Sequence, residues 1–211
     1  MNQIVSTLFL AAGLSLFQPG LAAAGKLQIS GQTLIYDTNT PGDGEVEGIE
    51  YDDVDRMLDM LRANEGLTTL QLNSTGGKVW AAQEISDMII DFELDTHVHG
   101  DCESACATVF LAGTRRTMSR GSRLGFHRFS WSADAIEDYY LRERDDNEWE
   151  TPFDFAEWMY EDTQNEVYDY LRYIIERGVS AEFAIEVISE TNDGLWRPKR
   201  RQLVAAGVLT E

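Results

Sequence analysis

The sequence predicts an α/β protein whose strands pair in parallel and are joined by crossover helices. Strand-like and helix-like patterns alternate between residues 27 and 126, which is typical of parallel sheets with right-handed connections. The length of 211 residues suits one domain with its own core. After residue 131 the pattern changes, and an acidic, aromatic helical insertion is expected over about 132–188.

The first elements lie between residues 27 and 72. An alternating run at 27–36 predicts an edge strand, and the polar segment 38–48 that follows predicts a flexible loop. Apolar residues at helical spacing predict a helix over 51–61. The apolar run 67–72 predicts the next strand, which leads into a glycine pair.

The second group of elements extends to residue 126. One apolar face predicts a helix over 79–92, and a short strand is expected at 96–99. A buried helix is expected over 104–112, followed by a strand at 123–126 that ends at His127. Polar side chains at the ends of parallel strands meet at one edge of the sheet, which is the usual place for a site in such folds.

The first 24 residues predict a secretory signal peptide. The segment 4–24 is uncharged, has an apolar stretch, and ends in small residues after Pro19-Gly20. Cleavage near Ala24 would leave a single domain at 25–211 and place the protein in the periplasm or outside the cell. An uncleaved membrane anchor is the alternative, but Gln18-Pro19-Gly20 interrupts the run that a spanning helix needs. No later segment of the sequence could span a membrane.

The net charge is strongly negative. The chain has 37 acidic and 17 basic residues, a formal net charge of -20. Such a surface repels phosphate backbones and anionic lipid headgroups, so no nucleic-acid partner is expected. A short basic run near the end is interpreted as balancing nearby acids; it comprises Arg197, Lys199, Arg200 and Arg201.

The chain has two cysteines, Cys102 and Cys106, and they bracket Ser104. In an oxidising compartment such a pair can form a disulfide, and four residues on one helical turn put the Cα atoms within the permitted range. The alternative is two small buried hydrophobic residues on a packed helix. The sequence leaves both open.

The insertion at 132–188 combines many acids with many aromatic residues. Polar-aromatic surfaces are typical of interfaces, so association of subunits is the first hypothesis. An acidic, aromatic lid over the site is the second. The third is a set of helices packed on their own sheet with their acids solvated.

Three motifs in sequence order carry the candidate chemistry. Gly76-Gly77 follows a strand and frees backbone N–H groups for an oxyanion. Ser104 opens a helix, where the positive end of the helix dipole favours a developing alkoxide. His127 follows the next strand and can act as the base that takes the serine proton.

The order and spacing of these motifs resemble the ClpP/crotonase superfamily, in particular periplasmic relatives of the Clp protease proteolytic subunit. The similarity covers about 49–127 and resumes at 203–209. It implies a ClpP/crotonase-like fold with a helical insertion that serves subunit association as a handle. It also implies a set of site residues: Ser104 as nucleophile, His127 as general base, Gly77 and Ala105 as oxyanion-hole donors, and Asp193 as the third triad member.

The resemblance implies an exported serine peptidase-like hydrolase that cleaves peptides or unfolded protein through an acyl-enzyme. No cofactor and no metal are expected. A homo-oligomer is expected, and no ATP-driven unfoldase, because no ATP fuels such a partner outside the cytoplasm. Crotonase-type acyl-CoA chemistry uses a similar oxyanion hole, but an exported protein has little access to that substrate.

Activity itself stays open at this point, because a catalytically inactive binding or scaffold protein could keep the same fold. Thr75 stands where the family usually has proline, and the acid Glu103 directly precedes the serine. A serine–lysine dyad with Lys78 ranks below the triad, since this lysine suits the exposed start of a helix. A G-x-S-x-G elbow is missing, which disfavours an α/β-hydrolase.

A zinc-binding protein is the remaining alternative. His97 and His99 lie two residues apart on a strand, hence on one face. The rest of the ligand set would come from Cys102, Cys106 and His127. This spacing matches no standard zinc signature.

Overall fold

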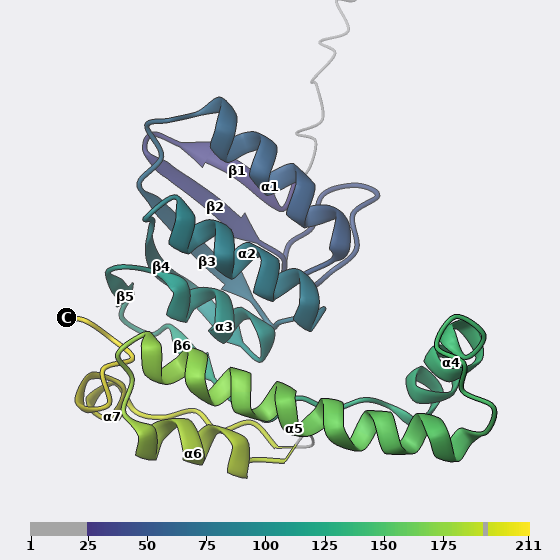
Figure 1. The fold of residues 1–211 in the computed structure, drawn as a ribbon. Helices are drawn as coiled ribbons and strands as arrows, with labels where there is room; N and C mark the ends of the chain where they lie inside the picture. Colours follow the sequence, from purple (N-terminus) through teal and green to yellow (C-terminus); the bar gives the residue numbers. More distant parts are fainter. Residues whose placement is uncertain (1–24, 192–193) are drawn as a thin grey trace, which may run out of the picture.

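The computed structural model describes residues 25–191 and 194–211, so the predicted signal peptide lies outside the described residues. A six-stranded sheet runs through the body in the order β1-β2-β3-β4-β5, and β6 pairs with the far part of β4 (Figure 1). The strands are β1 (Leu27–Ser30), β2 (Thr33–Asp37), β3 (Thr69–Ser74), β4 (Asp95–Glu103), β5 (Arg116–Met118) and β6 (Arg123–Gly125).

The strand pairs from β2 to β6 are parallel, which confirms the predicted α/β class. The run 27–36 is not one edge strand, however. It folds into an antiparallel hairpin of β1 and β2, with a two-residue turn between Ser30 and Thr33. The alternation of apolar residues continues through the turn, so the pattern alone does not reveal the reversal.

Three helices cover one face of this sheet: α1 (Tyr51–Ala63), α2 (Val79–Asp91) and α3 (Ala105–Ala112) (Figure 1). The core lies between them and the strands. All eight residues of α3 are buried, as expected for a central helix that is apolar on every side. The active-site serine candidate directly precedes this helix.

The second half of the chain is helical, with α4 (Ala133–Glu143), α5 (Pro152–Glu176), α6 (Ala181–Ser189) and α7 (Arg200–Ala205). The end of α5 is anchored on α3, since the Tyr173 hydroxyl donates to the Thr108 carbonyl at 2.8 Å and the Arg177 guanidinium donates to the Ala112 carbonyl at 2.9 Å. The start of α5 and all of α4 project away from the body (Figure 1). Within the described part of the chain, no helix is both long and apolar enough to cross a membrane.

Arg116 fastens the end of the chain to the sheet. Its side chain is buried and donates to carbonyl groups of Val208, Gly207 and Arg177 at 2.8–2.9 Å. A buried guanidinium is stable only when its N–H groups find acceptors. The C-terminal segment around Gly207 and Val208 is therefore part of the core of the fold.

Candidate active site

Ser104 occupies the turn between β4 and α3. Its backbone has φ 55° and ψ -128°, a conformation that non-glycine residues rarely adopt. It stands at the N-cap position, yet its side chain makes no capping hydrogen bond. The hydroxyl is therefore not used to stabilise the helix, although the backbone is held in a strained turn.

The glycine pair lies directly against this turn. A Cβ atom on Gly76 would come within 2.8 Å of the Ser104 Cβ and 3.1 Å of the Ala105 nitrogen, and one on Gly77 would come within 2.3 Å of the Ile49 nitrogen. Only glycine allows the chain to pass between these neighbours. The N–H groups of Gly77 and Ala105 have no acceptor among the described residues, and both belong to segments that meet at Ser104.

The strand register contributes to this meeting. Leu72 pairs with Val98, but Ser74 pairs with Cys102, so β4 contains two more residues than β3 between the same partners. The Asn73 carboxamide fills the irregular place by accepting the Asp101 N–H at 3.0 Å. This bulge lets the end of β4 reach the level of the glycine pair.

The loop 38–48, for which the sequence predicts flexibility, holds the glycine segment in place. The Thr38 hydroxyl donates to Ser74 Oγ at 2.6 Å, and the same oxygen accepts the Gly76 N–H at 3.1 Å. At the loop end, Ile49 donates its N–H to the Gly76 carbonyl and accepts the Lys78 N–H, both at 2.8 Å. Gly76 therefore has its own N–H engaged, and the neighbouring Gly77 N–H is the one left to face a ligand.

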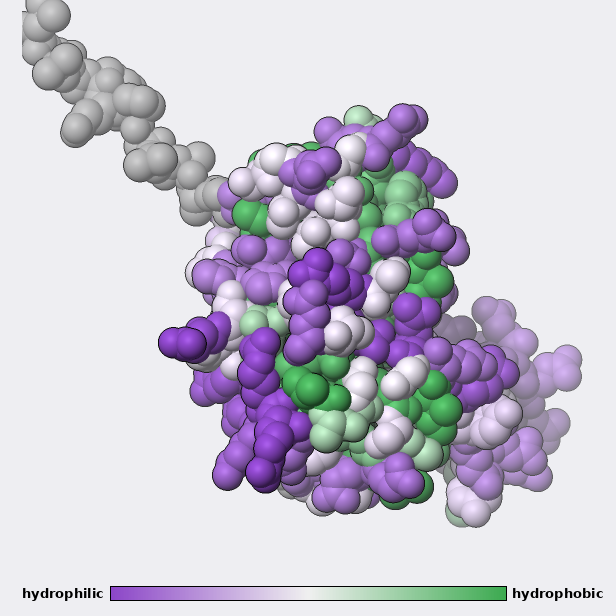
Figure 2. All heavy atoms as spheres, turned by 90° about the vertical axis from the view of Figure 1, so that its left-hand side faces the viewer, coloured by the Kyte–Doolittle hydropathy of each residue, from purple (hydrophilic) through white to green (hydrophobic). Residues whose placement is uncertain are grey.

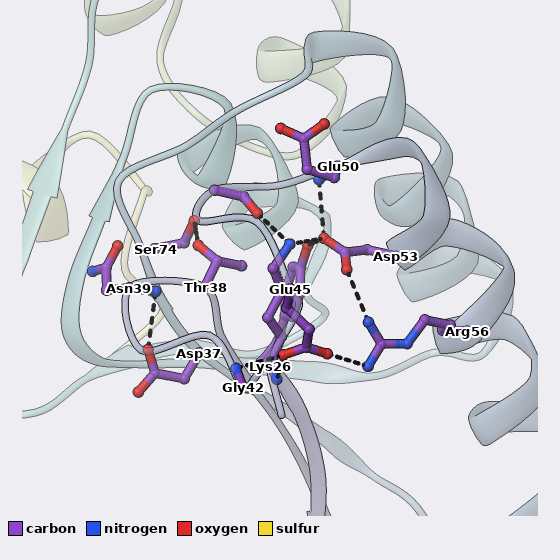
Figure 3. A network of polar contacts seen from close by, with 12 residues as sticks. Lys26, Asp37, Thr38, Asn39, Gly42, Glu45, Glu50, Asp53, Arg56 and Ser74 are labelled. Atoms are coloured by element: carbon purple, nitrogen blue, oxygen red, sulfur yellow. Dashed lines mark hydrogen bonds and ion pairs between the residues drawn. The ribbon is translucent and has the colours of Figure 1, made fainter. Parts of the chain in front are cut away.

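A buried polar network anchors this loop (Figure 3). Lys26 and Asp53 form an ion pair of 3.0 Å with both side chains almost fully buried, and the Tyr36 hydroxyl donates to the same carboxylate at 2.7 Å. Burial, followed by the charge of Asp53, raises the pKa of Tyr36. The Lys26 ammonium also donates to the Gly48 carbonyl at 2.8 Å. Breaking the Lys26–Asp53 pair would leave an uncompensated buried charge, which is costly. Lys26 is therefore held in place, and its bond to the Gly48 carbonyl fixes the end of the loop.

Glu45 fixes the other side of the loop (Figure 3). Its carboxylate accepts the backbone N–H groups of Lys26 at 2.7 Å and Gly42 at 2.8 Å, and it pairs with Arg56. Burial opposes ionisation of Glu45, but these hydrogen bonds outweigh it and lower the pKa of the carboxyl below its ordinary value.

His127 follows β6 and is partly buried. The Ser104 N–H donates to the Gly125 carbonyl at 3.0 Å. His127 lies two residues after Gly125, so this bond brings the histidine segment alongside the serine turn. The imidazole Nδ1 lies 2.8 Å from the Arg128 carbonyl. A carbonyl can only accept, so Nδ1 carries the hydrogen and the neutral ring has Nε2 free as a base. No hydrogen bond joins the Ser104 hydroxyl to the imidazole among the described residues.

The third candidate, Asp193, lies outside the described residues. The chain on either side of it runs along the histidine segment. Trp196 exchanges two backbone hydrogen bonds of 2.9 Å with Phe126, and the Arg128 N–H donates to the Glu190 carbonyl at 3.3 Å. The orienting carbonyl of Arg128 could not be found from the sequence, because every residue has a carbonyl group.

Glu103, the acid before the serine, is buried and paired. Its carboxylate accepts a hydrogen bond of 2.7 Å from Arg197 Nε. Its Cγ would lie 3.1 Å from a Cβ atom on Gly125, so the side chain packs on β6. The negative charge next to the nucleophile is therefore balanced by a cation.

Cys102 and Cys106 are joined by a disulfide, with a Cα–Cα distance of 5.2 Å. The bridge connects the end of β4 to the first turn of α3 across Ser104. It restricts the turn that presents the hydroxyl. It also leaves neither sulfur as a thiolate ligand for zinc.

The remaining candidates for a metal or a dyad have other partners. His97 lies 2.7 Å from Thr117 Oγ1 and 2.9 Å from Ser119 Oγ, and burial lowers the pKa of its imidazole. His99 shares Ser119 at 3.1 Å. No cluster of three or more metal-ligating side chains occurs among the described residues. The Lys78 ammonium lies over the exposed Tyr51 ring, 5.9 Å from its centroid.

A cavity of about 480 Å³ lies between the segment after His127 and the helical region. Arg128 and Phe129, which directly follow His127, form one wall. Apolar side chains of the helical region form most of the rest, namely Trp131, Ile136, Met159, Val167, Tyr170 and Ile188. Such a cavity suits an apolar side chain.

Comparisons with known proteins identify the fold. No protein-family model matches the chain, and no curated protein matches it in sequence. Among solved structures, a ClpP1 mutant from Listeria monocytogenes matches with a TM-score of 0.54 and 19% identity, over 85% of this chain and 90% of that one. The ClpP protease catalytic domain from Plasmodium falciparum matches with a TM-score of 0.51 and 14% identity, over 78% and 79%.

Proposed function

We propose that this chain, which has the ClpP fold, is a serine peptidase-like hydrolase that cleaves peptides through an acyl-enzyme. One observation carries the proposal: the strained turn holds the unengaged Ser104 hydroxyl beside the free N–H groups of Gly77 and Ala105. Strained residues persist where the surrounding structure over-determines them, and they cluster at active sites.

The chemistry would proceed in two steps. His127 Nε2 takes the Ser104 proton as the hydroxyl attacks the scissile carbonyl, and the imidazolium then returns that proton to the leaving amine. The Gly77 and Ala105 N–H groups donate to the tetrahedral oxyanion, each worth about 3 kcal/mol in the transition state. Water then attacks the ester with the same histidine as base, which releases the acid and restores the serine.

The histidine needs a fixed tautomer for this role. The bond from Nδ1 to the Arg128 carbonyl supports it, because it leaves Nε2 as the acceptor. We keep Asp193 as the proposed carboxylate partner that stabilises the imidazolium, since its neighbours in sequence run along the histidine segment.

The substrate would be a peptide or an unfolded protein segment. The apolar cavity lined by Arg128 and Phe129, the two residues after His127, favours an apolar side chain near the scissile bond. The disulfide at Ser104 is consistent with an exported, oxidising location, because such bonds are rare in reducing compartments. Exposed aromatic residues on α5, such as Phe153 and Tyr160, suit association with further copies of the chain.

A ClpP-fold scaffold without turnover is the second candidate. The observation that favours it is that no hydrogen bond joins the Ser104 hydroxyl to His127 among the described residues. Catalytic hydrogen bonds are often long in unliganded enzymes and tighten in the substrate complex, so we rank the hydrolase first.

Labelling with a fluorophosphonate probe tests the hydrolase. We expect covalent modification of the folded protein, complete loss of labelling in Ser104→Ala, and labelling about a hundredfold slower in His127→Ala. Ser189→Ala is the matched control, because this exposed serine bonds only its own helix. Mass spectrometry identifies the modified residue. A folded protein that does not react, or that reacts equally in Ser104→Ala, would favour the scaffold.

A further inference from the structure

A second cavity, of about 700 Å³, is lined in part by Arg197, the partner of Glu103. The connection between β5 and β6 and the segment before α7 form its walls. Five cationic side chains line it: Arg120, Arg123, Arg197, Lys199 and Arg200. The whole chain has only 17 lysines and arginines against 37 acids, so this cavity concentrates positive charge in a negative protein. Figure 2 faces the side of the molecule where β5 and α7 lie, and strongly hydrophilic side chains gather there.

Two of the five cations are neutralised within the protein. Arg123 pairs with Asp101 through Nε at 2.7 Å, and Arg197 pairs with Glu103 through Nε at 2.7 Å. The first pair lowers the pKa of Asp101, chiefly through the hydrogen bond from Arg123. Each of these two carboxylates therefore has one arginine of the cavity as its partner.

The other three cations have no carboxylate partner among the described residues. Arg200 donates to the neutral Met118 carbonyl at 2.9 Å. Arg120 is the second residue of a four-residue turn closed by the Ser122 N–H donating to the Ser119 carbonyl at 3.3 Å, so its side chain projects from the tip. Lys199 is exposed at the start of α7. The cavity therefore has a local excess of three positive charges.

Holding like charges in one concave place costs free energy unless a ligand or counterion compensates them. Among the described residues, the interpretation of the basic run as balancing nearby acids accounts for Arg197 alone. We infer that this cavity binds a compact multivalent anion that carries several carboxylate or phosphate groups. The volume suits an oligophosphate, a tricarboxylate or a short acidic peptide segment, and arginine forks match both kinds of oxygen.

The cavity is also connected to the candidate active site. Arg197 uses Nε for Glu103, the residue before Ser104, and its terminal nitrogens have no partner among the described residues. An anion bound there would share the guanidinium with Glu103. The inference on binding does not depend on the proposed hydrolase activity.

Isothermal titration calorimetry on the whole protein at low ionic strength tests the inference. The probes are tripolyphosphate, citrate and a hexaglutamate peptide, with chloride as the background anion. We expect at least one probe to bind with one site per chain, and its affinity to fall as sodium chloride is raised because salt screens exposed charges. The affinities of the three probes show whether the cavity prefers a phosphate, a small carboxylate or an acidic peptide.

The decisive variant is Arg120→Ala/Lys199→Ala, which removes two exposed cations from the cavity. We expect about tenfold weaker binding. Arg62→Ala/Arg172→Ala is the matched control, because it removes the same charge from α1 and α5 and should bind as the unmodified protein does. Equal weakening in both variants, unchanged binding in the first, or no binding of any probe would overturn the inference. Circular dichroism checks that both variants are folded, and probe labelling of Ser104 is measured separately.

Discussion

The Ser104 backbone is the residue-scale feature on which the candidate site depends. With φ 55° and ψ -128°, it aims the side chain out of the strand-to-helix turn at a cost of about 1–3 kcal/mol. A serine selected only for stability would be replaced by glycine here. The conformation therefore favours a role for the hydroxyl itself.

Substitution of this serine tests the strain. Ser104→Gly removes the Cβ atom that makes the conformation costly, whereas Ser104→Ala keeps it. We expect the glycine variant to have the higher free energy of unfolding in urea, by about 1 kcal/mol. At Glu161, an exposed position in the interior of α5, the alanine variant should instead be more stable than the glycine variant, because glycine is the poorer helix former. An alanine variant as stable as the glycine variant at 104 would contradict strain.

The tautomer of His127 cannot be inferred from the residue type. The residue type and its place after a strand indicate a base, and this could be stated from the sequence. Which ring nitrogen is free depends on the Arg128 carbonyl 2.8 Å from Nδ1. That bond is set by the local course of the backbone, which no motif encodes.

At the scale of elements, the end of β4, the start of α3 and the glycine segment form one unit. The bulge at Gly100–Asp101, the disulfide and the loop 38–48 all constrain it. The sequence pattern predicted the helix at 104–112, but the strand expected at 96–99 is longer in the structure, where β4 continues to Glu103. The bulge was not predicted, since it arises from the competition of Asn73 for a ladder hydrogen bond.

Gly76→Ala tests whether the glycine segment and Ser104 pack as described. The new methyl group would meet the Ser104 Cβ at 2.8 Å and the Glu103 carbonyl at 2.9 Å, at a φ of 104°. We expect a loss of about 3 kcal/mol in the free energy of unfolding, together with slower probe labelling.

Gly44→Ala is the control for this substitution. Gly44 also has a positive φ, of 82°, but its methyl group would meet nothing within 4 Å. It should cost about 1 kcal/mol, from the backbone conformation alone. If both variants lose the same stability in urea titrations, close packing of Gly76 on the serine turn is refuted.

At the scale of the whole molecule, the chain divides into a tightly packed body and a projecting tip of α4 and the start of α5 (Figure 1). No residue of α4 is buried. The tip is held together by an aromatic cluster in which Tyr139 packs on Trp149, Phe155 and Trp158. Such a small cluster stabilises the tip less than the main core stabilises the sheet.

Hydrogen exchange tests this division. At low protein concentration we expect the amides of α4 to exchange much faster than those of β3, which lies between β2 and β4 in the sheet. If the tip is an interface between copies, its protection should rise with protein concentration while that of β3 stays constant. Equal protection of α4 and β3 at every concentration would show that the tip is not a separate, weaker unit.

The sequence by itself determined the α/β class, the order of the main helices and strands, and the motifs that bring a serine, a glycine pair and a histidine to strand ends. These depend on local hydrophobic periods and on glycine, which are readable along the chain. It did not predict the β1–β2 hairpin or the short strand β5, whose existence depends on partners distant in sequence.

Only the tertiary structure decided how these parts meet. Residues as far apart as Lys26 and Asp53, or Glu103 and Arg197, become ion pairs only after folding. The basic run near the end is visible in the sequence. That three of its members, Arg197, Lys199 and Arg200, share one cavity with Arg120 and Arg123 is decided by the folded chain, in which Arg200 of α7 bonds the Met118 carbonyl of β5. Charges interact through space with a strength set by distance and burial, and neither quantity exists until the chain is folded.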